Sequence, residues 1–174
     1  MGEWDASRPA SGRSRASWPD ARSTISSVVA VDEVEAFFAE HLPFFSEFGF
    51  SIDALGSGTA VARFTYDERW VRPYGIINGG TLMALADVAV YLAIFSKMGI
   101  VPLAVTNELK MNFLRPAVGA DVLASASLLK LGRRVAYSSV DLHVEGEPDR
   151  LVAHATASYV LPDDDRSQTA PALS

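Results

Sequence analysis

A single carboxylate, Asp87, interrupts a long stretch that is otherwise uncharged and largely apolar. The stretch opens at Asn78 with the pair Gly79-Gly80 and runs to Phe95, and no other residue in it carries a charge. A segment that is apolar on nearly every side is typical of a buried helix, where an unpaired carboxylate is costly in free energy. Asp87 is therefore either tied to a backbone N–H or an arginine and only fixes packing, or it takes part in chemistry.

The glycine pair supplies a second group with chemical potential. Gly79 and Gly80 have no side chains, so a substrate carbonyl can approach the first backbone N–H groups of the helix that they open. Those donors and the positive end of the helix dipole stabilise a negatively charged oxygen. The pattern predicts an oxyanion site at the helix N-terminus, with Asp87 further along the same helix.

The elements that must position these residues form a mixed α+β pattern. The predicted elements are a helix over 31–41, strands over 48–55 and 59–67, the apolar helix from Gly79 to about Lys97, and strands over 103–114, 122–131, 135–144 and 151–161. Asp32 is the expected N-cap of the first helix. In the 103–114 strand, alternation places Val105, Leu109 and Met111 on one face and Thr106 on the other.

Short turns between the last four strands predict an antiparallel meander, because a parallel connection needs a long crossover. An antiparallel sheet needs one covered face, and the apolar helix is the only predicted element long enough to cover it. The sequence therefore predicts an antiparallel sheet of about six strands wrapped around one long central helix.

The ends of the chain differ in composition from this central part. Residues 1–30, rich in Ser and Arg, and residues 163–174 lack apolar periodicity and are predicted to be disordered tails. An organelle transit peptide is an alternative for the first tail, although its acidic residues disfavour it. We expect one domain over 31–162, which is long enough to bury a core.

Composition excludes several kinds of site and partner. The formal net charge of −6 disfavours nucleic acid as a partner, and the absence of Cys excludes disulfides and a thiol nucleophile. The three histidines are scattered and predict no metal site. No secretory signal is visible, and the longest uninterrupted apolar run, over 88–96, is short for a membrane span. The expectation is a cytoplasmic protein without a membrane partner.

Five segments, taken in their order and spacing, resemble the PaaI-like branch of the acyl-CoA thioesterases, which have the hotdog fold. They are Tyr74–Gly80, Leu85–Asp87, Asn112–Ala117, Leu131–Arg134 and Ala153–Ala157, within a resemblance that covers 45–162. The resemblance implies hydrolysis of an acyl-CoA thioester to an acid and CoA, with no cofactor beyond the CoA of the substrate. It also implies that the amide of Gly80 binds the oxyanion and that Asp87 is a general base or a nucleophile.

Helix geometry adds a prediction about assembly. Gly80 and Asp87 are seven residues apart, about 10 Å along a helix, whereas both must lie within about 3 Å of one reacting centre. Two antiparallel copies of the helix meet this requirement, with Gly80 of one chain beside Asp87 of the other. We therefore expect a two-fold homodimer with paired sites at its interface. The resemblance implies that such dimers pair into tetramers.

Further site residues follow from the resemblance and from two departures from it. Thr106 matches a position where a hydroxyl orients the attacking water, although an ordinary strand threonine is the alternative. Arg133 and Arg134 lie near a turn that often binds CoA phosphates in the family, or are solvated charges. Asn78 replaces the usual histidine before the glycines, and Arg72 replaces a frequent asparagine. Asn78 is expected to donate to the thioester oxygen, and Arg72 and Gly79 are expected to contact the substrate.

Two alternative functions stay open. Asn78 and Arg72 are compatible with a non-catalytic hotdog protein that binds acyl-CoA without turnover. A hotdog hydratase or dehydratase needs a histidine with an acid in the pocket, and no histidine falls near the glycine turn. The acyl group is not specified by the motifs. Aromatic residues near the helix are candidates for an apolar pocket or belong to the core: Trp70, Tyr74, Tyr91 and Phe95.

Overall fold

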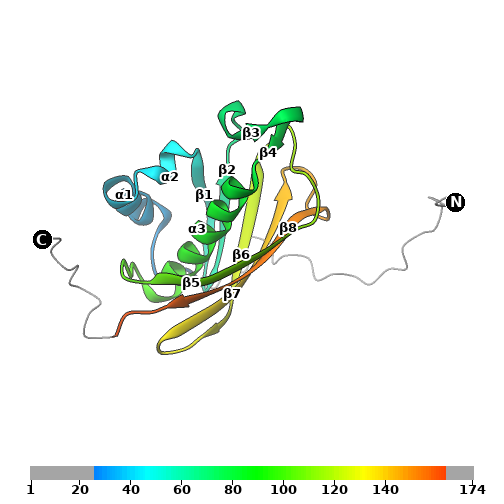
Figure 1. Ribbon diagram of the computed structural model, residues 1–174. Coiled ribbons are helices and arrows are strands. Elements are labelled where there is room, and N and C mark those ends of the chain that lie inside the picture. Colours follow the sequence, from blue (N-terminus) through cyan, green and yellow to red (C-terminus); the bar gives the residue numbers. More distant parts are fainter. Residues whose placement is uncertain (1–25, 164–174) are drawn as a thin grey trace, which may run out of the picture.

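The computed structural model describes residues 26–163, in which a six-stranded antiparallel sheet curls around one long helix (Figure 1). The predictions for 1–25 and 164–174 lie outside the described residues. The elements are α1 (Val31–His41), α2 (Phe44–Glu47), β1 (Phe50–Gly56), β2 (Thr59–Phe64), β3 (Val71–Arg72), β4 (Ile76–Ile77), α3 (Gly79–Met98), β5 (Val105–Phe113), β6 (Val122–Leu131), β7 (Val135–Val144) and β8 (Leu151–Val160).

Helix α3 begins and ends close to where the sequence predicts. The Asn78 side-chain oxygen accepts a hydrogen bond from the Thr81 N–H at 2.9 Å, which caps the N-terminus, and Gly99 ends the helix with a φ of 89°. With 20 residues, α3 is long and apolar enough to cross a membrane, contrary to the expectation from the 88–96 run, but 67% of its most apolar 18-residue window is buried inside the protein. It is the core helix of the fold.

The strand order corrects the predicted four-strand meander. The sheet runs β1-β2-β6-β7-β8-β5, so only β6, β7 and β8 form a meander, whereas β5 pairs with β8 at the sheet edge. The connection over 114–121 has to pass three strand spacings, about 14 Å, and its residues extend to roughly 26 Å. This connection is long enough for β5 to pair either with β6 or with β8, so its length does not reveal which pairing forms.

A β-bulge in β5 corrects the predicted alternation of that strand. Thr106 pairs with Tyr159 and Glu108 pairs with Ser158, so Asn107 is an extra residue between them. Thr106 therefore faces α3, and beyond the bulge Leu109 also packs against the core. The predicted face change between Thr106 and Leu109 does not occur because the bulge shifts the alternation by one residue.

The N-terminal part of the domain starts earlier than predicted. Ser26 forms a bridge with Gly56, and the Val28 N–H donates to the Ser96 carbonyl at 3.0 Å, so residues 26–30 contact the domain. Helix α1 has the predicted bounds, but its N-cap is Ala30. Asp32 lies inside the helix and accepts a hydrogen bond from the neighbouring Glu33 N–H instead.

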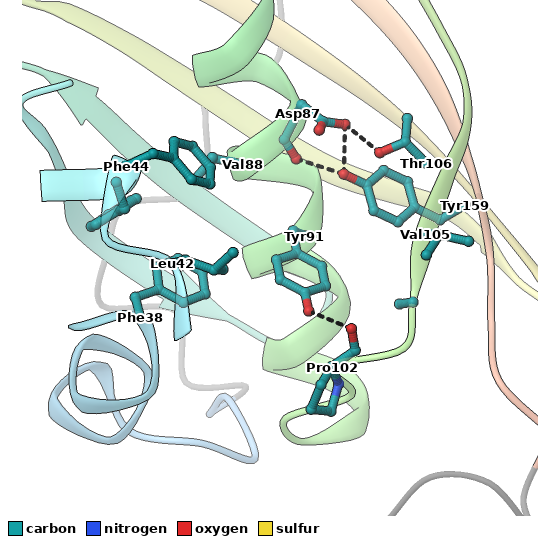
Figure 2. Close-up of a pocket in the computed structure, with 12 residues that line it drawn as sticks. Phe38, Leu42, Phe44, Asp87, Val88, Tyr91, Pro102, Val105, Thr106 and Tyr159 are labelled. Atoms are coloured by element: carbon teal, nitrogen blue, oxygen red, sulfur yellow. Dashed lines mark hydrogen bonds between the residues drawn. The ribbon is translucent and has the colours of Figure 1, made fainter. Parts of the chain in front are cut away.

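Helices α1 and α2 cover one side of α3. The Phe38 ring stacks near Tyr91 of α3, with ring centroids 6.1 Å apart, and packs edge-on against Phe45 at 4.8 Å. Figure 2 shows this side of α3, with Phe44 beside Val88. Helix α2 is too short to give a periodic sequence pattern, and the sequence did not predict it. Together α1 and α2 form a cap over the middle of the core helix.

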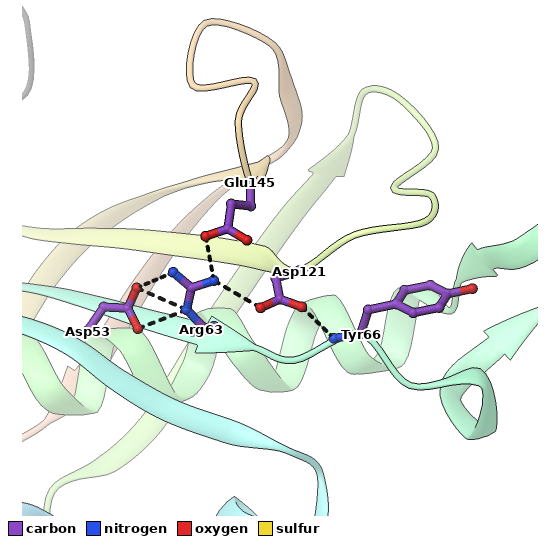
Figure 3. A network of polar contacts seen from close by, with 5 residues as sticks. All are labelled: Asp53, Arg63, Tyr66, Asp121 and Glu145. Carbon is purple, nitrogen blue, oxygen red and sulfur yellow. Dashed lines mark hydrogen bonds and ion pairs between the residues drawn. The ribbon is translucent and has the colours of Figure 1, made fainter.

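Arg63 of β2 joins four segments on the outer face of the sheet (Figure 3). Its guanidinium donates to Asp53 at 2.7 Å, to Asp121 at 2.9 Å and to Glu145 at 2.8 Å. Asp121 also accepts from the Tyr66 N–H at 2.9 Å. The hydrogen bonds to Asp53 and Glu145 raise the pKa of Arg63 above its usual range, so the group stays charged.

Replacement of Arg63 should destabilise the fold. Arg63→Met leaves three neighbouring carboxylates without their shared cation, and we expect a loss of about 1–2 kcal/mol in the free energy of unfolding. Urea unfolding followed by circular dichroism measures the change. Arg69→Met is the matched control, because Arg69 forms one exposed ion pair with Asp67. Equal stability losses in the two variants would contradict the structural role of Arg63.

Candidate active site

The Asp87 carboxylate is held by two hydroxyl groups from the far edge of the sheet. Thr106 Oγ1 of β5 donates to Asp87 Oδ1 at 2.8 Å, and the Tyr159 hydroxyl of β8 lies 2.6 Å from the same oxygen (Figure 2). The Tyr159 hydroxyl is also 3.0 Å from the Asp87 carbonyl. Within residues 26–163, Asp87 is thus tied neither to an arginine nor to a backbone N–H, which were the partners expected of a purely structural carboxylate.

The two oxygens of the carboxylate have different surroundings. Both hydroxyls bind Oδ1, and within the described chain Oδ2 of Asp87 has no hydrogen-bond partner. Asp87 is half-buried and lines a cavity. One oxygen therefore fixes the orientation of the carboxylate, while the other is left to accept a proton or to attack a carbon atom.

Tyr159 is the residue of this site that sequence analysis missed. Its ring is 2% exposed, and burial together with the nearby Asp87 charge raises the pKa of Tyr159 well above its usual range, so the hydroxyl remains a donor. The three alternate positions before it on β8 are buried alanines, Ala153, Ala155 and Ala157. A large residue with a hydroxyl at the end of such a row was the signal that the sequence contained.

A cavity of about 300 Å³ begins beside Asp87 and extends between α3 and the cap formed by α1 and α2. Its polar lining is concentrated at Asp87, Thr106 and Tyr159, and the remaining walls are mainly apolar. The lining residues are Phe38, Leu42, Phe44, Phe45, Asp87, Val88, Tyr91, Pro102, Ala104, Val105, Thr106 and Tyr159. Cavities of this size and character hold small organic ligands in many proteins.

Of the aromatic residues named as pocket candidates, only Tyr91 lines the cavity. Phe95 is completely buried in the core, and Trp70 stacks on Phe48 with ring centroids 4.3 Å apart. Tyr74 is 93% exposed and has a left-handed φ of 71°. The pocket therefore depends mainly on residues of the cap and of the segment before β5.

The two glycines at the start of α3 have different roles in packing. A Cβ atom on Gly79 would lie 3.1 Å from the Phe113 ring, so this position is small because β5 packs on it. A Cβ atom on Gly80 would meet only the Asn78 side-chain oxygen, and Gly80 is exposed. The approach to the Gly80 backbone is therefore open, whereas Gly79 is covered by the protein itself.

Asn78 is occupied by structural contacts. Besides capping Thr81, its side-chain amide donates to the Trp70 carbonyl at 2.9 Å. Neither Asn78 nor Gly80 lines the cavity beside Asp87, and Gly80 lies about two helical turns away from that residue. A single chain does not bring Gly80 and Asp87 to one reacting centre.

The three predicted arginines lie outside the cavity. Arg72 of β3 and Arg133 in the β6–β7 turn are exposed, and no ion pair to either is found within residues 26–163. Arg134 pairs with Asp163 at 2.8 Å, and its carbonyl accepts from the Leu161 N–H. The β6–β7 turn therefore lies beside the residues that follow β8, and these residues come shortly after Tyr159 in the sequence.

The histidines do not contribute to the cavity. His41 stacks on Phe37, and His154 pairs with Asp141 at 2.7 Å, while burial lowers the pKa of His143. Across residues 26–163 no group of three or more metal-ligating side chains is found. The arrangement required for a His-dependent hydratase is therefore missing from the described cavity.

Comparisons with known proteins agree with this geometry. A family model described as the thioesterase superfamily matches residues 74–151. A candidate thioesterase from Silicibacter sp. TM1040 is 37% identical, with 79% of this chain and 95% of that chain covered and a TM-score of 0.71. A mutant of the phenylacetic acid degradation protein PaaI from Thermus thermophilus is 32% identical over 69% of this chain and 99% of that chain, with a TM-score of 0.60.

A curated relative extends the comparison to a protein with a described substrate. The medium/long-chain acyl-CoA thioesterase YigI of Escherichia coli is 28% identical, and the alignment covers 76% of this chain and 94% of YigI. The curled sheet, the single core helix and these similarities agree over nearly the full length of the relatives. The chain therefore belongs to the thioesterase superfamily and has the hotdog fold, with PaaI among its structural relatives.

Proposed function

We propose that the protein hydrolyses acyl-CoA thioesters and that Asp87 carries the reaction. The observation that supports this most directly is the unequal use of the carboxylate, whose Oδ1 binds two hydroxyls at the polar end of an apolar cavity. An acyl-CoA substrate is also what the name of the YigI relative describes. The apolar cavity suits the acyl group, and the polar end suits the thioester.

The proposed reaction uses Oδ2 of Asp87. As a general base it takes a proton from water while the water oxygen bonds to the thioester carbon, and the carbonyl oxygen becomes an oxyanion. Collapse of this intermediate breaks the C–S bond, and the CoA sulfur receives the proton held by Asp87. Direct attack by Oδ2 is the alternative: it forms an anhydride and breaks the C–S bond, which releases CoA as a thiolate. Water then hydrolyses the anhydride to the acid and restores Asp87, and the thiolate takes up the proton that this step frees. Thr106 and Tyr159 keep the carboxylate oriented in both routes.

The oxyanion requires a donor that the same chain does not place beside Asp87, and we assign it to Gly80 of a second copy. Gly80, Met83 and Asp87 lie on one partly exposed side of α3. The neighbouring strand β5 is a sheet edge with exposed Val105 and Phe113, and such an edge favours pairing with another chain. A two-fold dimer of this face completes two equivalent sites.

A second candidate function is acyl-CoA binding without turnover. It is favoured by Asn78, because its side-chain oxygen and one N–H of its amide already serve Thr81 and Trp70, which leaves the thioester with fewer donors. Calorimetry with acyl-CoA, run beside an assay for free CoA thiol, separates the two functions. Binding without thiol release in the intact protein would support this second candidate.

Asp87→Asn should abolish most hydrolysis. The amide neither accepts a proton nor attacks the thioester, so we expect the release of CoA thiol from acyl-CoA to fall by about 10²-fold or more. Glu40→Gln is the matched control, since it makes the same chemical change on the exposed side of α1. Circular dichroism confirms that both variants fold. An unchanged rate in Asp87→Asn would remove Asp87 from the mechanism.

Tyr159→Phe should lower kcat about tenfold with little change in KM, which is the effect expected from losing one hydrogen bond to a charged group. The ring and its packing are retained, so only the hydroxyl that orients Asp87 is lost. Steady-state kinetics measures both constants. Tyr137→Phe, which removes an exposed hydroxyl on β7, serves as control. A normal kcat in Tyr159→Phe would show that Thr106 alone orients the carboxylate.

Mixed dimers test the shared site. Asp87→Asn and Gly80→Val should each be inactive alone, because one lacks the base and the other blocks the approach to the backbone N–H. In a refolded equal mixture, half of the dimers contain both variants, and each of these has one intact site. We therefore expect about a quarter of the wild-type activity to return. If activity stays at the sum of the two variants, Gly80 and Asp87 do not act across a dimer.

A further inference from the structure

The walls of the cavity suggest how the protein selects its acyl group, an inference that rests on the proposed thioesterase function. The hydroxyl and carboxylate groups lie at the Asp87 end, and the rest of the lining consists mainly of apolar side chains from the cap, α3 and the segment before β5. A thioester at Asp87 would therefore place its acyl chain along the α1–α2 cap, where no charged group faces it.

Packed aromatic rings form the wall of the cavity on the side of the α1–α2 cap. Phe38 and Phe45 of the cap are 1% and 7% exposed, and their ring centroids are 4.8 Å apart. Tyr91 of α3, which also lines the cavity, contacts Phe95 with ring centroids 4.2 Å apart. Rings held by several neighbours move little without loss of packing, so they limit the length of chain that the cavity accepts.

The Tyr91 hydroxyl does not make this wall polar. It donates to the Pro102 carbonyl at 3.1 Å, and burial raises the pKa of Tyr91 to about 12, so the group stays neutral. The hydrogen bond also holds the segment that carries Ala104 against α3. The ring of Tyr91 is thus presented to the cavity as an apolar surface, with its polar atom already satisfied.

We propose that this cavity binds an unbranched aliphatic acyl chain of about eight to ten carbons and that the α1–α2 cap sets the upper limit. The volume of about 300 Å³ corresponds to roughly ten groups of the size of a water molecule, each about 30 Å³, and a methylene is of similar size. Each methylene that enters the cavity should raise kcat/KM about fourfold, and chains longer than the cavity should gain nothing further.

A series of acyl-CoA substrates tests the proposal. We expect the kcat/KM of the wild-type protein to rise from butyryl-CoA to octanoyl- or decanoyl-CoA and to stop rising or fall at palmitoyl-CoA. Ala104→Leu fills part of the cavity from a buried lining position. It should lower the ratio of decanoyl-CoA to butyryl-CoA kcat/KM by tenfold or more.

Two further variants make the result specific to the cavity. Ala36→Leu makes the same change on the exposed side of α1 and should leave the ratio as in the wild type. Phe44→Ala opens the cap at a side chain that is 37% exposed and should raise the ratio of palmitoyl-CoA to octanoyl-CoA kcat/KM. A wild-type rate that is independent of chain length, or an Ala104→Leu effect equal on all chains, would overturn the proposal while leaving hydrolysis established.

Direct binding separates this inference from the proposed reaction. Calorimetry with 1-decanol, an uncharged chain of the predicted length, should show binding to the wild-type protein and at least tenfold weaker binding to Ala104→Leu. If no acyl-CoA is hydrolysed and 1-decanol still binds in this way, the cavity assignment stands and the catalytic proposal fails. If 1-decanol binds both proteins equally, or neither, the cavity is not the acyl site.

Discussion

The site depends on how the fold satisfies one carboxylate on a helix that is otherwise apolar. Asp87 has no partner on α3, so its hydrogen bonds come from across the sheet, from Thr106 and Tyr159. These two donors lie on β5 and β8, the two strands at one edge of the sheet, so the polar end of the cavity lies at that edge. The rotation of α3, the pairing of β5 with β8 and the position of the cavity are therefore linked by two short hydrogen bonds. A buried polar group fixes a unique arrangement where apolar packing alone tolerates several.

Much of the architecture was accessible from the sequence because its signals are local. The Asn78 cap, the glycine after α3 and the turns between the late strands define elements that the structure places nearly as predicted. The pairing of β5 with β8 was not accessible, since it depends on contacts between distant segments. The residues of the candidate site divide in the same way, into those with a local signal and those that depend on distant contacts. Asp87 stood out as a lone charge, whereas the contact of Tyr159 with Asp87 became recognisable only when β8 was placed beside β5.

The glycine pair shows that adjacent residues of one type need not share a role. Gly79 is small so that Phe113 can pack on the start of α3, and Gly80 is open on its outer side. A motif of two glycines thus joins a packing requirement at Gly79 to an open backbone at Gly80, where we propose the oxyanion binds. The same holds at the other end of the cavity, where Tyr91 both binds the Pro102 carbonyl and forms an apolar wall.

The bulge at Asn107 has a consequence for how this edge strand can change. It lets Thr106 face α3 at the start of β5 while Leu109 still faces the core further along. Without the extra residue, a regular strand presents one of these two side chains inward and turns the other to solvent. The length of β5 therefore helps to determine the geometry of the candidate site. A gain or loss of one residue in β5 turns either the Thr106 hydroxyl away from Asp87 or Leu109 away from the core. Substitutions at single positions do not reveal this constraint.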